Sequence, residues 1–178
     1  MTTIPSYRTW VAGEVVVASY FNSNIRDAGN FWLARPLCIL RQTSAQTLTT
    51  ATWTDLLMDT EDIDRDGGHS TVTNPARYTS PTAGYLLLGG GAGFAANATG
   101  QRGVRWALNG TTINGTQVFI SAVAAQVLTL ANRAIFQAVN GTTDYVTNQG
   151  HQTSGGNLNT AVTTDQQPSF HILWVSTL

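Results

Sequence analysis

The chain has 178 residues, of which 42% are apolar, and this is enough for one domain with a sizeable core. Only 11% of the residues are charged and the formal net charge is −1, so no basic face for binding nucleic acid is expected. All nine basic residues are arginines, which excludes lysine-dependent chemistry such as a Schiff base or a Walker lysine.

Two further absences in the sequence limit the class of protein. No apolar run is long enough to span a bilayer, and no signal peptide is evident at the amino terminus, so membrane insertion is not expected. Cys38 is the single cysteine and cannot form an intrachain disulfide. We therefore expect packing and oligomerisation to supply the stability of the fold.

The pattern between Ser19 and Leu33 predicts a short amphipathic helix, because aromatic and apolar residues recur at three- and four-residue spacing. Ser19 is a suitable N-cap, and Pro36 ends the helix. We expect residues 1–36 to form an N-terminal helical segment before a domain of residues 37–178. A helix this short either folds back onto its own domain or attaches the chain to a neighbour. The candidate attachment residues are Tyr20, Phe21, Ile25, Phe31 and Trp32.

After Pro36 the pattern indicates short β-strands and no helix. In residues 104–108, the large apolar residues Val104, Trp106 and Leu108 alternate with Arg105 and Ala107, which is typical of a half-buried strand. Three Asn-Gly pairs, at residues 109–110, 114–115 and 140–141, are strong hairpin signals. Strand-like runs at this spacing favour a sandwich, jelly roll or barrel. Further runs lie at residues 37–40, 52–57, 86–88, 118–120, 127–130, 134–139 and 170–175.

Six of the ten acidic residues lie between Asp55 and Asp66. Asp62, Asp64 and Asp66 alternate and precede Gly67, a pattern that can wrap a hard cation because aspartates supply oxygen ligands and glycine permits a sharp turn. These three residues are the candidate calcium ligands, and calcium is the one candidate cofactor. The alternative is a solvated acidic turn, partly paired with Arg65 or Arg77.

No other motif indicates catalysis or cofactor binding. The glycine-rich run at residues 89–93 opens no helix and lacks the surrounding repeat of a dinucleotide site, so close approach of β-backbones accounts for it better. The three histidines share no ligand spacing. We therefore expect no enzymatic activity. An enzyme that degrades envelope polysaccharide remains an alternative, and it would need facing carboxylates such as Asp144 and Asp165.

Residues 11–27 read VAGEVVVASYFNSNIRD. This segment resembles an amino-terminal signature of tail-region proteins from phages and prophages of actinobacteria. The resemblance covers about the first fifth of the chain, and it implies that this end attaches the protein to the virion.

The order of features from Asp62 onward resembles a trimeric jelly-roll domain. An acidic loop precedes a Pro/Gly turn at residues 81–84, an apolar run at residues 86–88 and a hairpin at residues 100–110, and a closing apolar strand follows. The superfamily is that of tumour necrosis factor and the complement globular head, in the versions carried by phage virions. It implies an all-β jelly-roll sandwich that forms a homotrimer. The candidate trimer contacts are Tyr85, Phe94, Phe136 and Trp174, and the core is the alternative place for each, because both environments favour the same residue types.

These resemblances together predict a homotrimeric minor tail or tail-tip protein, located in the virion, with other phage structural proteins as partners. A capsid decoration or head-fibre protein is the alternative, and copy number per particle would separate the two. The polar, weakly charged composition suits host attachment through cell-surface carbohydrate. We expect such a site near residues 141–160, which are read as long polar loops.

Overall fold

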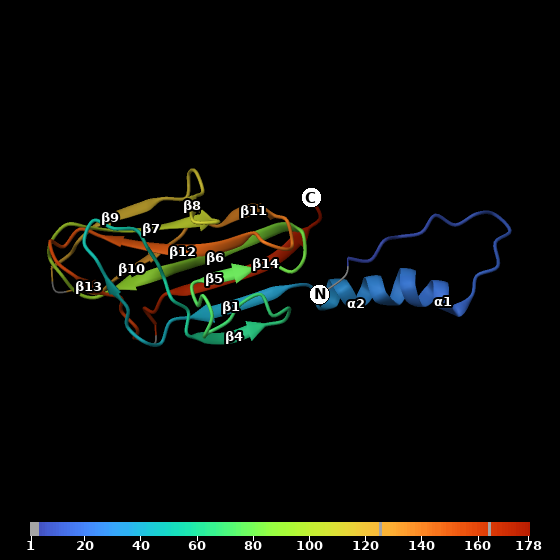
Figure 1. Cartoon of the computed structure of the whole chain (residues 1–178), viewed down its shortest axis with the longest axis horizontal. Coiled ribbons are helices and arrows are strands. Elements are labelled where there is room, and N and C mark those ends of the chain that lie inside the picture. Colours follow the sequence, from blue (N-terminus) through green and yellow to red (C-terminus); the bar gives the residue numbers. More distant parts are fainter. Residues whose placement is uncertain (1–3, 125, 164) are drawn as a thin grey trace.

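The computed structural model describes residues 4–124, 126–163 and 165–178. Two antiparallel β-sheets pack face to face as a sandwich, and a helical segment projects from one end of it (Figure 1). The chain is therefore an all-β jelly roll preceded by a short helical segment, as the sequence predicts.

The first sheet contains the strand that follows the helix and the strand that ends the chain. Its strand order is β10-β6-β14-β1-β4, and β11 also pairs with β6. The strands are β1 (Leu37–Arg41), β4 (Thr60–Asp64), β6 (Gly84–Phe94), β10 (Leu128–Ala131), β11 (Ile135–Val139) and β14 (Ser169–Ser176). The long strand β6 pairs with β14 on one side and with β10 and β11 on the other.

The second sheet has β12 and β7 at its centre. Its strand order is β3-β12-β7-β8, with β5 also paired to β12 and β9 also paired to β7. The strands are β3 (Thr54–Asp55), β5 (Arg77–Thr79), β7 (Gln101–Leu108), β8 (Thr111–Thr112), β9 (Val118–Ser121) and β12 (Tyr145–Gln152). A small ribbon pairs β2 (Thr47–Leu48) with β13 (Leu158–Asn159).

The core lies between the two sheets and is formed by side chains at alternate strand positions. Trp106 of β7 and Phe170 of β14 are in ring contact, with centroids 5.0 Å apart. The indole N–H of Trp106 donates to the carbonyl oxygen of Arg133 at 2.8 Å, so this large ring is buried with its polar atom satisfied. Other buried members of the core are Leu40, Leu86, Leu88, Phe94, Val104, Val146 and Ile172.

The three Asn-Gly pairs have three different roles. Asn109 and Gly110 both have positive φ, at 51° and 78°, and they join β7 to β8 as the predicted hairpin turn. Asn114-Gly115 lies between β8 and β9, which both pair with β7, so it interrupts a returning strand instead of starting a hairpin. Asn140-Gly141 connects β11 in the first sheet to β12 in the second. The dipeptide therefore indicates a turn in each case, whereas the strand pairing around it is decided by the sandwich.

The predicted helix is present but is irregular. It consists of α1 (Ala18–Phe21), a π-helical turn η1 (Asn22–Arg26) and α2 (Asp27–Leu33). The N-cap is Val17, without a side-chain hydrogen bond, so the expected cap at Ser19 is wrong. The helix ends before Pro36 as predicted. Among the described residues, no helix has both the length and the apolar character needed to span a membrane.

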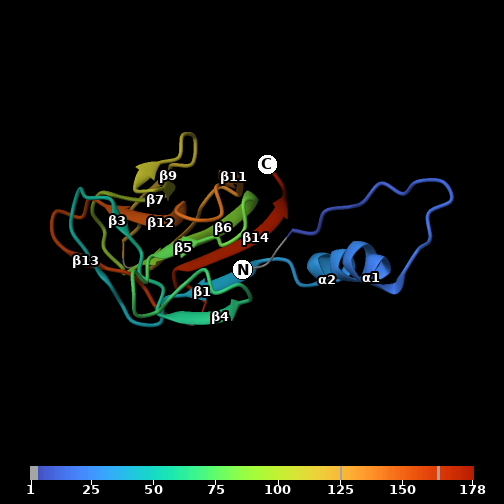
Figure 2. The same cartoon turned by 45° about the vertical axis from the view of Figure 1, so that its right-hand side comes forward.

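One aromatic contact joins the helix to the sandwich. The Phe31 ring packs edge-on against Trp174 of β14 with centroids 5.0 Å apart, and Trp32 lies 6.0 Å from the same indole. Residues 4–17 run outward beside the helix, and the chain then returns through α1 and α2 to β1 (Figure 2). Both described ends of the chain therefore lie at the helical end of the sandwich.

Arg102 is a buried cation that is held without a carboxylate. Its side chain points inward from β7 and is fully buried, and its guanidinium donates to the carbonyl oxygens of Asn97, Thr99 and Gln101, each at 3.0 Å. These bonds satisfy three backbone carbonyls at the start of β7.

We expect Arg102→Met to lower the free energy of unfolding by about 2–4 kcal/mol, because it removes the donors to the Asn97 and Thr99 carbonyls, whereas the Gln101 carbonyl keeps the backbone N–H of Thr153. Urea unfolding followed by circular dichroism measures the change. Arg133→Met, at an exposed arginine, is the matched control and should stay within about 0.5 kcal/mol of the wild type. Equal stability of the two variants would show that the Arg102 bonds contribute nothing net.

Candidate functional site

The outer face of the first sheet carries an apolar row that crosses four strands. Strand register places Leu37 of β1 beside Leu173 of β14, Leu173 beside Leu87 of β6, and Leu87 beside Phe136 of β11. These residues alternate with core positions and therefore point away from the sandwich interior. We call these four residues the apolar row. A shallow apolar hollow beside it is lined by Leu37, Ile39, Leu87, Gly89, Ala134, His171 and Leu173.

Two predicted trimer-contact residues lie on this face and two do not. Tyr85 is 41% exposed and Phe136 is 65% exposed, and both are available to another copy of the chain. Phe94 and Trp174 are 0% and 1% exposed and belong to the core, so their prediction as trimer contacts is wrong for the fold of one chain. The reason is strand alternation, which turns these two side chains inward.

The sequence analysis missed Leu37, Leu87 and Leu173. The signal that could have found them is a continuous apolar run, such as residues 86–88 or 172–175. In a strand that is buried on one face only, apolar and polar residues would alternate. Such a run indicates a sheet that is covered on both faces.

The N-terminal segment exposes three of the five predicted attachment residues. Phe21, Ile25 and Trp32 are each at least half exposed. Phe31 is buried against Trp174 and fixes the helix to the jelly roll. Tyr20 is half-buried because Arg8 lies over its ring at 4.1 Å. Other exposed apolar side chains in this segment are Tyr7, Trp10, Val11, Val15, Val16, Val17 and Leu33.

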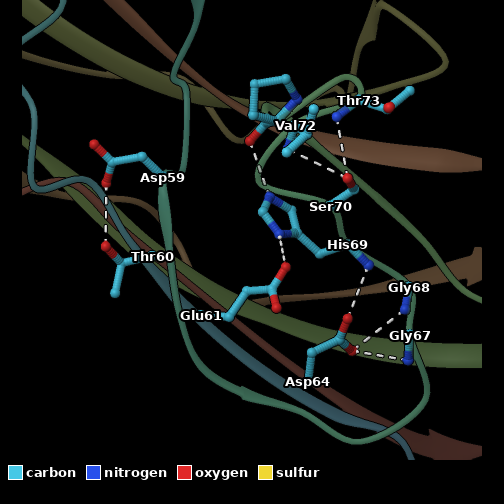
Figure 3. Close-up of polar contacts among 11 residues, drawn as sticks. Asp59, Thr60, Glu61, Asp64, Gly67, Gly68, His69, Ser70, Val72 and Thr73 are labelled. Atoms are coloured by element: carbon cyan, nitrogen blue, oxygen red, sulfur yellow. Dashed lines mark hydrogen bonds and ion pairs between the residues drawn. The ribbon is translucent and has the colours of Figure 1, made fainter.

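The acidic loop is organised by Asp64 (Figure 3). One carboxylate oxygen accepts the backbone N–H groups of Gly67 and Gly68 at 3.1 and 3.3 Å, and the other accepts that of His69 at 3.0 Å. Three backbone donors in a tight turn are thereby satisfied by one side chain. The role of Asp64 in this structure is to shape the loop.

His69 fastens the same loop to β4. Its side chain is buried, with Nδ1 at 2.8 Å from a carboxylate oxygen of Glu61 and Nε2 at 3.0 Å from the carbonyl oxygen of Pro75 (Figure 3). Both ring nitrogens are therefore used within the protein. This histidine is a structural clamp and not an exposed ligand.

Asp62 and Asp66 are directed to different partners. The carboxylate of Asp62 pairs with the guanidinium of Arg41, and this hydrogen bond holds the pKa of Asp62 below its usual value. Asp66 accepts the hydroxyl hydrogen of Tyr78 at 2.8 Å, while burial raises the pKa of Asp66.

The three candidate calcium ligands do not converge. Within residues 4–124, 126–163 and 165–178, no group of three or more His, Cys, Asp or Glu side chains is placed to hold a metal ion. Each of Asp62, Asp64 and Asp66 already has a protein partner, so calcium coordination by all three would require the loop to open. The pairing expected for an acidic turn with Arg65 or Arg77 is also absent from the described residues, since Asp62 uses Arg41.

The alternative catalytic carboxylates are not paired either. Asp144 accepts the side-chain amide of Asn109 at 2.8 Å and the backbone N–H of Asn140 at 2.8 Å, so it ties two turns together. Asp165 lies in a separate exposed segment before β14. Residues 145–152 of the region expected to be long loops form strand β12 instead, because residues 146–152 pair with β7 and Tyr145 pairs with β5.

The fold is similar to that of solved tumour-necrosis-factor-like proteins. Murine APRIL at pH 8.0 aligns with a TM-score of 0.57 and 12% identity, over 78% of this chain and 98% of that chain. Eiger TNF from S. frugiperda aligns with a TM-score of 0.53 and 12% identity, over 81% of this chain and 96% of that chain. No family model and no curated protein matches the sequence. At this level of identity the similarity shows the fold alone, a tumour-necrosis-factor-like jelly roll.

We expect calcium removal to leave the melting temperature of the protein unchanged, because the three aspartates of the acidic loop are held by separate protein partners. At a free-calcium concentration of a hundred times the Kd, a bound ion would stabilise the fold by about 2.7 kcal/mol. For a chain of this size, that would raise the melting temperature by about 5–10 °C. Differential scanning calorimetry with calcium and with EDTA measures this. A drop of that size in EDTA, lost in Asp64→Asn, would establish a metal site in the loop.

Proposed function

We propose that the chain is a non-enzymatic structural component of a phage virion, a homotrimeric minor tail or tail-tip protein that is attached through its N-terminal segment and contacts the host surface. The observation that carries the proposal is the apolar row on the outer face of the first sheet. A folded monomer gains nothing from exposing Phe136 and Tyr85, whereas an oligomer buries them.

A rotational assembly is the simplest way to cover this face on every copy. Each chain presents the same sheet, so a closed ring satisfies all copies at once. The sequence resemblance to trimeric jelly rolls supports three as the number of copies. Strand β1 begins only a few residues after α2, so a rotational trimer brings its three N-terminal segments out at the same end.

The exposed apolar side chains of the N-terminal segment support attachment to another virion protein. Phe21 and Ile25 lie on the helix and are exposed, whereas Phe31 is buried against Trp174. The resemblance of residues 11–27 to phage tail-region proteins gives the class of that partner. The carboxylates of Asp64 and Asp144 serve backbone hydrogen bonds, which supports a binding or structural role over a hydrolytic one.

We expect the wild-type protein to have a mass of about 57 kDa in solution, three times the 19.0 kDa chain. Leu87→Arg should give monomers, because it places a charge in the middle of the apolar row. Val72→Arg, at a side chain that is 85% exposed on a loop, is the control and should remain trimeric. Light scattering after gel filtration measures the mass. A monomeric wild type would overturn the trimer.

The double variant Phe21→Asp and Ile25→Asp should be depleted at least tenfold from purified particles of the phage that encodes it, because charged side chains replace the apolar docking surface. Quantitative mass spectrometry of the particles measures incorporation, with Val72→Asp as the control. Copy number in the same experiment separates a tail protein from a capsid decoration protein. Absence of the wild-type chain from the particles would contradict the virion role.

A further inference from the structure

The outer face of the second sheet carries an aromatic row. Register places His151 of β12 beside Gly103 of β7, and Gly103 beside Phe119 of β9, while Trp53 precedes β3 on the other side of His151. The Trp53 ring lies 4.8 Å from His151 and 5.6 Å from Phe119, measured between centroids. A Cβ at residue 103 would lie 2.4 Å from the Phe119 ring, so glycine allows that ring to lie against the strand.

A polar row lies directly beside the aromatic one. Arg105 donates through Nε to the side-chain oxygen of Gln149 at 2.6 Å, and the Gln149 amide donates to a carboxylate oxygen of Asp55 at 2.8 Å. The hydroxyl of Thr147 donates to the same Asp55 oxygen at 2.9 Å. These bonds fix the orientation of three planar polar groups before any ligand arrives.

Two guanidinium groups on this face stack on aromatic rings. Arg105 lies over Trp53 at 4.1 Å, and Arg77 lies over Tyr145 at 4.0 Å. Within the described part of the chain, Arg105 makes hydrogen bonds through Nε alone, and the Arg77 side chain makes no hydrogen bond or ion pair. The stacking holds each guanidinium group in place, and its terminal N–H groups remain able to donate hydrogen bonds.

We propose that this face binds an anionic saccharide, an inference that rests on the host-surface role in the proposed function. The Trp53 and Phe119 rings offer apolar surface to the C–H face of a sugar ring. Asp55, which is half-buried, offers a carboxylate acceptor to its hydroxyl groups, and the buried amide of Gln149 holds Asp55 in place. The guanidinium forks of Arg77 and Arg105 match a carboxylate or a phosphate on the saccharide.

The charge and composition of the face favour this ligand over a nucleic acid. Two arginines and one aspartate are too few basic groups to neutralise a polynucleotide backbone, and the whole chain carries a net charge of −1. The residues involved come from five strands or strand ends of a rigid sheet, which suits a small ligand held at fixed points. Of the residues 141–160 that were expected to carry a carbohydrate site, those of β12 lie on this face, and the other residues of the face come from outside that range.

Isothermal titration of the purified protein with three probes tests the proposal. The probes are a galacturonate tetrasaccharide, a glycerol-phosphate oligomer and neutral maltotetraose. One anionic probe should bind at least tenfold more tightly than maltotetraose, and which one does so assigns the anion as carboxylate or phosphate. Binding of none of them, or equal binding of all three, would overturn the proposal.

Variants on the face decide whether binding occurs there. Trp53→Ala and Arg105→Gln should each weaken the Kd for the anionic probe at least tenfold. Arg41→Gln and Trp32→Ala, which lie outside the second sheet, should leave it unchanged. If Trp53→Ala lowers the melting temperature, Arg77→Gln is the variant that tests the site. The Arg77 side chain makes no hydrogen bond to a described residue, so this change removes none. Unchanged binding in Arg77→Gln and Arg105→Gln would contradict the site.

The trimer and the saccharide site are tested by different measurements, so one proposal can be contradicted while the other holds. Leu87→Arg acts on the other sheet, so the monomer it should produce is expected to keep the wild-type Kd per chain. A monomeric wild type that binds the anionic probe would overturn the trimer and leave the site intact. A trimer that binds no probe would overturn the site alone.

Discussion

The first sheet is apolar on both faces, and this constraint organises the rest of the structure. Its inner face supplies Leu86, Leu88 and Phe170 to the core of the sandwich. Its outer face presents Leu87, Leu173 and their neighbours, which no other part of the described chain covers completely. Burial of apolar area at about 25 cal/mol per Å² stabilises the contact between the sheets, and covering the outer face would draw on the same effect.

The second sheet meets a different requirement. Its inner face completes the core through Val104, Trp106 and Val146. Its outer face covers β12 with stacked and hydrogen-bonded side chains from neighbouring strands, centred on Arg105 and Gln149. The outer faces of the two sheets therefore differ, with an apolar row on one and a polar and aromatic surface on the other.

Candidate sites differ in how far the sequence could predict them. The exposed helix residues Phe21 and Ile25 follow from helical spacing, because no long-range pairing is needed to place them. The alternating aspartates looked like a metal loop, but Arg41 and Tyr78 come from distant segments and take up Asp62 and Asp66. The row formed by Trp53 and Phe119 could not be predicted, since these residues are far apart in sequence and meet only through strand register.

Local sequence patterns predict the all-β class, the helix before Pro36 and the Asn109-Gly110 hairpin. These are set by side-chain period, proline geometry and turn conformation within a few residues. The tertiary structure decided which face of each strand is buried. Phe94 and Trp174 became core while Phe136 became surface, because the strand pairing determines which side of each sheet faces the other.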